Sequence, residues 1–355
     1  LFWRKCLRQD MKLFENLKLI SLRYDHAPHK DRRSCPDNAM MYTRVLVRVL
    51  QALRAEIWPI LLGLSAESLE SEFMLTPIDL NVLDRSSVLD EKTRKQIDVD
   101  LPRCHQENAI LASTEGQTCL RFVLEAWLET HLQSSDYCQG LDSLAAPFVT
   151  LFFHRCCVNT DLSETARDQV VDPADACDPQ ADEAAGLECS QNKRGAPCMR
   201  LAVQPAYCCL VAFTGRFLDQ IFASGSTSML RAQLAEFSEL LSAELPQLAS
   251  HFRDEGVTVE LFAIPWLLTL FAHVLPLPNV LQLWDVLLTH GDDPRAESLP
   301  LYVAISVLRQ SEAHLVTLDF NGMLLHLSRL PPIDLDCALR DAVVKWTAGS
   351  TADAL

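Results

Sequence analysis

The chain has 355 residues, of which 49% are hydrophobic, so it is long enough to bury a sizeable core in one large domain or two lobes. Its formal net charge of -16 argues against nucleic acid or an anionic membrane as the main partner, without excluding a local basic surface. Its 13 cysteines have no repeating spacing, which argues against a disulfide framework and favours reduced thiols in a core.

The amino-acid usage favours helices over strands. Gly and Tyr are scarce, with 11 and 5 residues, while Leu and Ala are abundant, and this balance predicts an all-α fold. The chain does not begin with Met and carries no signal sequence, so we expect it to be a piece of a longer protein.

Residues 1–35 form a basic N-terminal extension. Leu7, Met11, Phe14 and Leu17 recur at helical spacing and predict that part of this segment is an amphipathic helix. We expect it to pack on the rest of the chain, and contact with a membrane or a partner is the alternative. Its basic residues outnumber its acidic ones; they are Arg4, Lys5, Arg8, Lys12, Lys18, Arg23, Lys30, Arg32 and Arg33.

A first lobe is expected over residues 36–204. Apolar side chains recur every three or four residues in its opening stretch and predict a helix with a broad apolar face. The next helix carries Arg54 and Trp58, and Gly63 is a natural end for it. Residues 64–96 alternate capping residues with short apolar pieces, which predicts short helices and loops.

The stretch 97–140 holds two motifs that together suggest a reaction. In Ile-Asp-Val-Asp-Leu-Pro-Arg103, the Arg follows a Pro and can stand clear of a helix end. In Tyr-Cys-Gln139-Gly, the Gln precedes a Gly and can project from a turn, so that both side chains can face one cleft. From the spacing alone, an ion pair between Asp100 and Arg103 and a plain turn at Gln139 are the alternatives.

A fixed cation and a neutral amide, without a metal or a titrating base, suit phosphoryl transfer. There a protein positions water and neutralises charge on phosphate oxygens. The guanidinium of Arg103 has a fork of N–H donors that matches phosphate oxygens. The amide of Gln139 can accept a hydrogen bond from an attacking water and donate one to a phosphate oxygen. The two side chains therefore make a candidate site for this chemistry.

The neighbours of Arg103 have expected roles of their own. We expect Asp100 to fix the loop, or the Arg103 side chain, through a charge-assisted hydrogen bond. Cys104 and His105 have no second ligand pair at zinc spacing, so a metal site is not expected there. The helix that includes Trp127 is expected to pack its apolar face against the loop that bears Arg103.

The composition shifts in residues 159–198. The segment has few large apolar side chains and cannot bury enough surface to offset the entropy of ordering, so we expect a disordered acidic insertion. Its acidic residues outnumber Arg167, Lys193 and Arg194; they are Asp161, Glu164, Asp168, Asp172, Asp175, Asp178, Asp182, Glu183 and Glu188.

A second lobe is expected over residues 205–346, followed by a frayed tail over 347–355. The run 261–284 contains no Asp, Glu, Lys or Arg and is long enough to be a transmembrane candidate. Prolines split it, however, so we expect two helices within an all-α lobe and no transmembrane segment.

The two motifs resemble those of a known family. Ile-x-x-Asp-x-x-Arg103, followed further along by Tyr-x-Gln139-Gly, resembles the TBC domain of Rab GTPase-activating proteins. The segment 53–63 is similar to the opening segment of that family, and the segment 263–273, with Leu-Trp-Asp285 after it, is similar to its distal helices. The resemblance is closer still to the TBC domain of the TBC kinase-like proteins, in the sequences Asp-Leu-Pro-Arg-Cys-His-Gln and Gln-Gly-Leu-Asp-Ser-Leu-Ala-Ala-Pro-Phe.

The resemblance implies an all-α, two-lobed TBC domain with a cleft between the lobes, which accelerates GTP hydrolysis by a Rab-type small GTPase in its GTP state. Arg103 and Gln139 would be catalytic fingers supplied in trans. The partner GTPase binds the GTP and the Mg²⁺, so the chain needs no cofactor or metal of its own. Cys138 replaces an aromatic residue common in close relatives. The supporting residues that the resemblance implies are Arg54, Trp58, Asp100, Tyr137 and Gly140.

The rival hypothesis is a non-catalytic Rab-binding or scaffolding module of the same fold, because many family members keep the fold without both fingers. Here both fingers are present, which favours the activator. A helical scaffold without a GTPase partner is the third hypothesis. We expect a monomer that binds no nucleic acid and lies in the cytoplasm at the periphery of trafficking membranes. The cilium or flagellum is the other location that the resemblance suggests.

Overall fold

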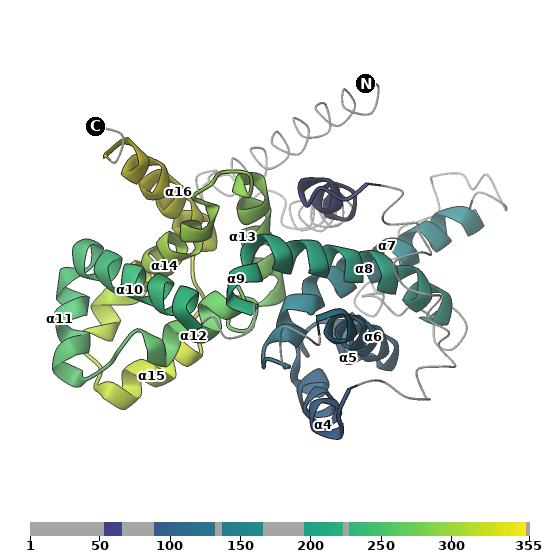
Figure 1. Ribbon diagram of the computed structural model, residues 1–355, viewed down its shortest axis with the longest axis horizontal. Helices are drawn as coiled ribbons and strands as arrows, with labels where there is room; N and C mark the ends of the chain where they lie inside the picture. The colour runs from purple at the N-terminus through teal and green to yellow at the C-terminus, as the bar shows by residue number, and fades with distance from the viewer. Residues whose placement is uncertain (1–52, 66–88, 132–136, 166–194, 223–226, 353–355) are drawn as a thin grey trace, which may run out of the picture.

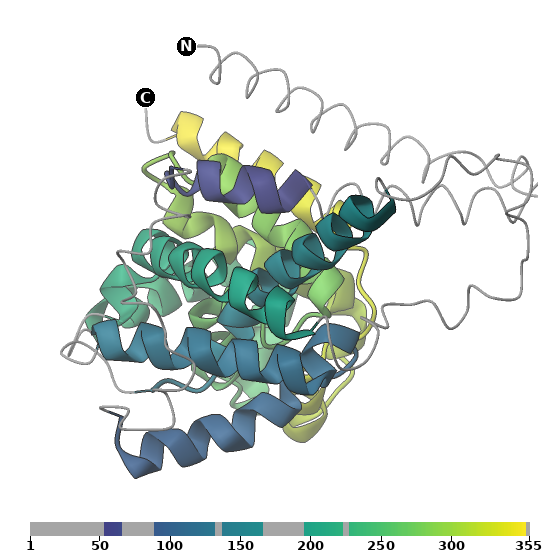
Figure 2. The same ribbon diagram turned by 90° about the vertical axis from the view of Figure 1, so that its right-hand side faces the viewer.

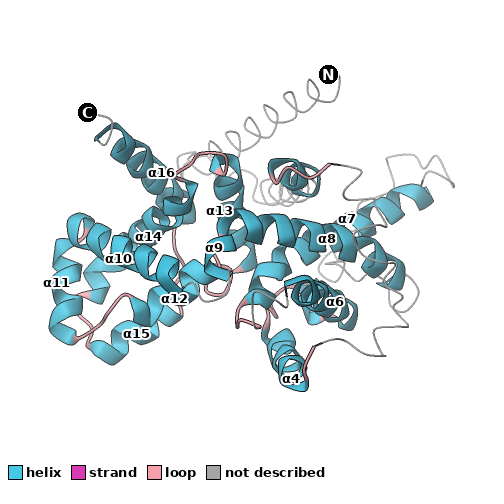
Figure 3. Cartoon of the chain, viewed as in Figure 1, coloured by secondary structure: helices cyan, strands magenta, loops and turns pink. Residues whose placement is uncertain are grey.

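The computed structural model describes residues 53–65, 89–131, 137–165, 195–222 and 227–352. Within these ranges the chain consists of helices joined by loops and turns, without a strand (Figure 3). The all-α prediction is therefore confirmed. The expected N-terminal extension at 1–35 and residues 166–194 of the expected acidic insertion lie outside the described residues.

The first lobe consists of the helices up to α8. In chain order they are a helix over residues 53–61, α4 (Glu91–Asp100), the 3-10 helix η2 (Leu101–Arg103), α5 (Ala109–Ala112), α6 (Thr114–His131), α7 (Leu141–Thr165) and α8 (Gly195–Phe217). The long helices α6, α7 and α8 contact one another pairwise, and η2 contacts α6. The prediction that the helix around Trp127 packs against the turn that carries Arg103 is thus confirmed.

The second lobe consists of the remaining helices. They are α9 (Asp219–Phe222), α10 (Thr227–Glu244), α11 (Pro246–Glu255), α12 (Glu260–Leu268), α13 (Leu277–His290), the 3-10 helix η3 (Ala296–Ser298), α14 (Leu299–Leu315), α15 (Phe320–Ser328) and α16 (Leu335–Ala352). Helix α14 packs against α10 and α16, and α12 packs against α15. Figure 1 shows the two lobes side by side, with α13 between them.

Of the three prolines expected to split the long apolar run, only Pro276 lies between two helices; Pro265 lies inside α12, and Pro278 lies in the first turn of α13. Helix α12 ends at Leu268, and α13 begins after Pro276, whose backbone is extended. The prediction of two helices in this run is confirmed. In the part of the chain that the structure describes, no helix is long and apolar enough to cross a membrane.

Three helices run beyond the expected boundaries. Helix α7 continues to Thr165, α16 continues to Ala352, and α8 passes through the expected lobe boundary at 204/205. Pro205 lies inside α8, where it lacks the N–H of a normal helical hydrogen bond, at a cost of about 3 kcal/mol or more. Ala202 and Ala206, on either side of Pro205, are buried. Tertiary packing of this kind outweighs the low helix propensity of proline.

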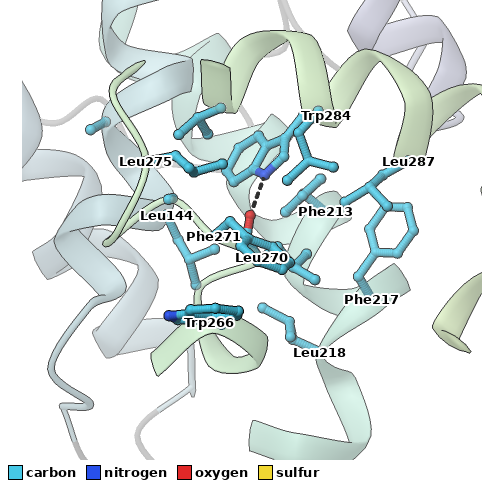
Figure 4. Packing of buried hydrophobic residues seen from close by; sticks show 14 of the residues in the cluster. Leu144, Phe213, Phe217, Leu218, Trp266, Leu270, Phe271, Leu275, Trp284 and Leu287 are labelled. Atoms are coloured by element: carbon cyan, nitrogen blue, oxygen red, sulfur yellow. Dashed lines mark hydrogen bonds between the residues drawn. The ribbon is translucent and has the colours of Figure 1, made fainter. Parts of the chain in front are cut away.

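A cluster of buried aromatic rings joins the two lobes. Trp58 meets Phe148 of α7 with ring centroids 5.9 Å apart, and Phe148 lies 5.4 Å from Trp284 of α13. Phe213 of α8 stacks on Trp284 at 4.2 Å (Figure 4). Trp58 belongs to the helix 53–61, which Figure 2 shows in purple. Because these rings come from both lobes, the core is continuous across the molecule.

Candidate functional site

Arg103 stands on the turn that ends α4. Ile97 and Leu101 are buried and anchor this turn, and Pro102 is the second residue of η2. The Arg103 side chain is exposed, and among the described residues no hydrogen bond or ion pair holds it. The helix-end ion pair with Asp100, which was the alternative from the sequence, does not form. The guanidinium therefore lies at the surface with its donors available to a ligand.

Gln139 lies on a short loop that leads into α7. Its side chain is exposed, and Leu141 begins the helix. Gly140 has φ +102°, a left-handed conformation that L side chains rarely adopt. A Cβ at this position would also lie 2.6 Å from Cγ2 of Thr269, which belongs to the second lobe. Both the backbone angle and the close approach therefore require glycine directly after Gln139.

A partly buried hydrogen bond ties the two loops together. The Tyr137 hydroxyl donates to Oδ2 of Asp100 at 2.9 Å, and the Gln96 amide donates to both Asp100 carboxylate oxygens at 3.1 Å. Of the two roles predicted for Asp100, the structure shows the one that fixes the loop. Because Asp100 precedes Arg103 by three residues and Tyr137 precedes Gln139 by two, this bond brings the two motifs together.

Two titratable groups at this contact stay protonated. Burial raises the pKa of Tyr137, and the charge of Asp142 and the hydrogen bond to Asp100 raise it further. Burial also raises the pKa of the Cys104 thiol, with Asp142 adding to the effect. A thiol in this environment is a poor nucleophile, so the chemistry of the site does not run through Cys104.

His105 and Glu107 contact each other in the loop after Arg103. His105 has φ +45° and its Nδ1 lies 3.1 Å from Oε1 of Glu107. Burial acts to raise the pKa of Glu107, but the interactions of the carboxylate with its own amide and with His105 outweigh burial, so the pKa is lowered.

Arg54 has a different environment from Arg103. Its Nε donates to both oxygens of Asp285 at 3.1 Å, and its Nη2 donates to Oδ2 at 2.8 Å. Trp58 Nε1 donates to Oδ1 of the same carboxylate at 2.9 Å. All three side chains are buried, so Arg54 cannot reach an external ligand. This network fastens the helix 53–61 to α13.

Three residues of this arrangement have no role in the sequence prediction: Asp285, Thr269 and Glu107. Asp285 belongs to the Leu-Trp-Asp sequence that contributes to the resemblance. That sequence indicates that Asp285 is important, but it does not indicate which residue Asp285 contacts. Thr269 belongs to the segment 263–273, which also contributes to the resemblance, but the sequence does not show that it faces Gly140. Glu107 carries no sequence signal. Among the described residues, no cluster of His, Cys, Asp and Glu is arranged to hold a metal ion.

Comparison with known proteins assigns the family. Residues 51–316 match the sequence model of the Rab-GTPase-TBC domain. The chain belongs to the Rab-GTPase-TBC domain family. The match extends from the start of the helix 53–61 to the end of α14, and it includes the Arg103 and Gln139 loops of this TBC domain.

Curated relatives agree with this assignment. The TBC domain-containing protein kinase-like protein of Mus musculus is 30% identical over 305 residues, which are 85% of this chain and 28% of the relative. The protein of that name from Gallus gallus is 29% identical over the same shares. The GTPase-activating protein gyp1 of Schizosaccharomyces pombe is 26% identical over 69% of this chain and 42% of the relative. The chain thus spans less than a third of the length of the kinase-like relatives.

Solved structures show the same fold. The crystal structure of the Ypt/Rab-GAP domain of Gyp1p aligns with a TM-score of 0.62 at 20% identity, over 84% of this chain and 89% of that one. The Chlamydomonas flagellar RabGAP TBC domain aligns with a TM-score of 0.53 at 17% identity, over 97% and 92%. The prediction of a TBC fold is confirmed.

Proposed function

We propose that this TBC domain accelerates GTP hydrolysis by a Rab-type small GTPase in its GTP state. The observation that carries the proposal is the 2.9 Å hydrogen bond from Tyr137 to Asp100. It fastens together two loops that each present an exposed side chain, Arg103 on one and Gln139 on the other. Membership of the Rab-GTPase-TBC family names the class of partner.

In this proposal Arg103 enters the nucleotide site of the GTPase and stabilises the charge that develops between the β- and γ-phosphates. Its planar fork suits two phosphate oxygens at once. Gln139 orients the attacking water through its amide. GTP and Mg²⁺ belong to the partner, so the TBC domain contributes no cofactor. An arginine supplied in trans accelerates a GTPase by roughly 10³- to 10⁵-fold.

The other predicted residues act by holding this arrangement. Asp100 and Tyr137 fasten the two loops to each other, and Gly140 lets the Gln139 loop approach the second lobe. Arg54 and Trp58 brace the lobes through Asp285. These five residues are therefore proposed as supporting residues that do not touch the nucleotide.

A panel of GTP-loaded Rab proteins, assayed for phosphate release with and without the TBC domain, tests the proposal. We expect at least one Rab to respond, and Arg103→Ala and Gln139→Ala each to lower its stimulated rate by more than about 100-fold. Arg329→Ala is the control, because it removes another exposed arginine, between α15 and α16, and should leave the rate unchanged.

Two outcomes would contradict the proposal. A Rab that binds without faster hydrolysis would support the non-catalytic Rab-binding module. A stimulated rate that survives Arg103→Ala would leave activation in place but exclude Arg103 as its source.

A further inference from the structure

Thr269 of the second lobe contacts the loop that carries Gln139. A Cβ added to Gly140, the residue after Gln139, would lie 2.6 Å from Cγ2 of Thr269. Because a Cβ stands about 1.5 Å from its Cα, this methyl group lies within about 4.1 Å of the Gly140 Cα, which is van der Waals contact. The backbone directly after Gln139 therefore lies against a methyl group of the other lobe.

The hydroxyl of Thr269 fixes the direction of that methyl group. Its Oγ1 donates to the Pro265 carbonyl at 2.7 Å and accepts from the His273 amide at 3.1 Å. Because two hydrogen bonds hold Oγ1 and both γ atoms are attached to one Cβ, χ1 is fixed and Cγ2 keeps its place against Gly140. Thr269 is buried, so water does not compete for its hydroxyl.

The backbone that carries Thr269 is also fixed. Thr269 is the C-cap of α12, and the next two residues, Leu270 and Phe271, have φ of +44° and +66°. Such backbone is strained in residues other than glycine and persists only where the surroundings enforce it. The Phe271 amide donates to the Trp266 carbonyl at 2.7 Å, as in a Schellman motif. Trp284 Nε1 donates to the Leu270 carbonyl at 3.0 Å, as Figure 4 shows, so the end of α12 is held in one conformation.

We propose that Thr269 is a positioning residue for Gln139: its methyl group sets the distance of the Gly140 backbone from the second lobe, and so the place from which the Gln139 amide reaches the water. This inference rests on the function proposed above, in which Gln139 orients the attacking water. A displacement of about 1 Å can cost 10²-fold in rate, so the contact of one methyl group is sufficient to matter. Arg103 stands on a turn that buried residues of the first lobe anchor, so its position should not change with this contact.

Two substitutions separate the methyl group from the hydroxyl. Thr269→Ser removes Cγ2 and keeps both hydrogen bonds, whereas Thr269→Val keeps Cγ2 and leaves the His273 amide without its acceptor. In single-turnover GTP hydrolysis by a responsive Rab, Thr269→Ser should lower the maximal rate about tenfold without changing the half-saturating concentration of the TBC domain. Thr269→Val should lower the urea midpoint of unfolding further than Thr269→Ser, because it leaves a buried donor unsatisfied, and yet keep more of the rate. The same order of the two variants in both measurements would overturn the proposal.

Thr150→Ser is the matched control. Thr150 is also buried, and its hydroxyl donates to the Ala146 carbonyl at 3.1 Å, but it lies within α7. The substitution removes a buried methyl group of the same size, so it should lower the urea midpoint by a similar amount and leave the stimulated rate unchanged. A loss of rate as large as in Thr269→Ser would show that loosening of the core, and not the Gly140 contact, slows hydrolysis.

Combination with the finger variants assigns the effect to one finger. Thr269→Ser should have no further effect on the rate in a Gln139→Ala background and its full effect in an Arg103→Ala background. Equal effects in both backgrounds would contradict a role through Gln139.

A test of the contact itself does not depend on GTPase activation. Gly140→Ala places a Cβ against Cγ2 of Thr269, so Thr269→Ser should reduce the shift in the urea midpoint that Gly140→Ala causes, and Thr269→Val should not. Gly63→Ala is the control, because Gly63 also has positive φ with nothing within 4 Å of an added Cβ, and its shift should be the same in every background. If no Rab responds to the wild-type domain, the proposed function fails, and this comparison still decides the contact. An equal shift for Gly140→Ala with and without Thr269→Ser would refute it.

Discussion

The Tyr137 hydroxyl decides how closely the Arg103 and Gln139 loops are coupled. Tyr137→Phe keeps the ring and removes the donor, so the buried Asp100 carboxylate keeps only the Gln96 amide. Hydrogen bonds to charged groups are worth about 1.5–3 kcal/mol, and we expect a loss of that size in urea unfolding. We also expect the stimulated hydrolysis rate to fall about tenfold with unchanged Rab affinity. An unaltered rate would show that the loops keep their positions without this bond.

The chemistry of the site predicts a flat pH profile. A guanidinium keeps its proton and an amide has none to lose near neutrality. Burial raises the pKa of Tyr137 and of Cys104, so neither group loses its proton as the pH rises through the neutral range. Stimulated hydrolysis should therefore vary little between about pH 6 and 8. A bell-shaped profile would contradict this and direct attention to His105.

At the scale of residues, the sequence predicted the exposure of the Arg103 and Gln139 side chains but not the contacts that their loops make. A Pro before Arg103 and a Gly after Gln139 were sufficient to predict two projecting side chains, and both are exposed. The sequence did not decide whether Asp100 bonds to the loop or to the Arg103 side chain, because a carboxylate at a helix end has backbone groups and charged side chains nearby. The Tyr137 contact spans 37 residues, and spacing carries no information about it.

At the scale of elements, the loop before α7 depends on glycine for two separate reasons. Gly140→Ala forces a side chain into positive φ, at about 1–2 kcal/mol, and drives its Cβ to 2.6 Å from Thr269. Gly63→Ala is a matched control, because Gly63 has φ +78° with nothing within 4 Å of an added Cβ. We expect Gly140→Ala to cost more in urea unfolding than Gly63→Ala, and it alone to lower stimulated hydrolysis. Equal costs would mean that Thr269 yields without moving the loop.

Helix boundaries show where local rules end. Pro276 lies between α12 and α13, with an extended backbone, and α13 begins directly after it. Pro205 has the same intrinsic cost, yet α8 continues through it and packs against both α6 and α7. Whether a proline ends a helix or lies inside one therefore depends on tertiary packing, which the composition does not reveal.

At the scale of the whole molecule, the fold class was predictable and the joining of the lobes was not. Abundant Leu and Ala, with few Gly, favour helices wherever they lie in the chain, and so the all-α class follows from composition. The contact between Arg54 and Asp285 joins residues 231 positions apart. Only the folded structure brings such a pair together, and this pair links the first described helix to α13.

The Arg54 contact predicts how the lobes unfold. Removing one partner of a buried ion pair leaves the other charge uncompensated, so Arg54→Ala should cost about 3–5 kcal/mol in urea unfolding. Lys95→Ala is the control, because its pair with Glu91 is largely exposed and worth at most about 1 kcal/mol. Because the aromatic core is continuous between the lobes, we expect a single transition followed equally by fluorescence and circular dichroism. Two separated transitions in Arg54→Ala would instead show that this pair, and not the shared core, makes the two lobes unfold together.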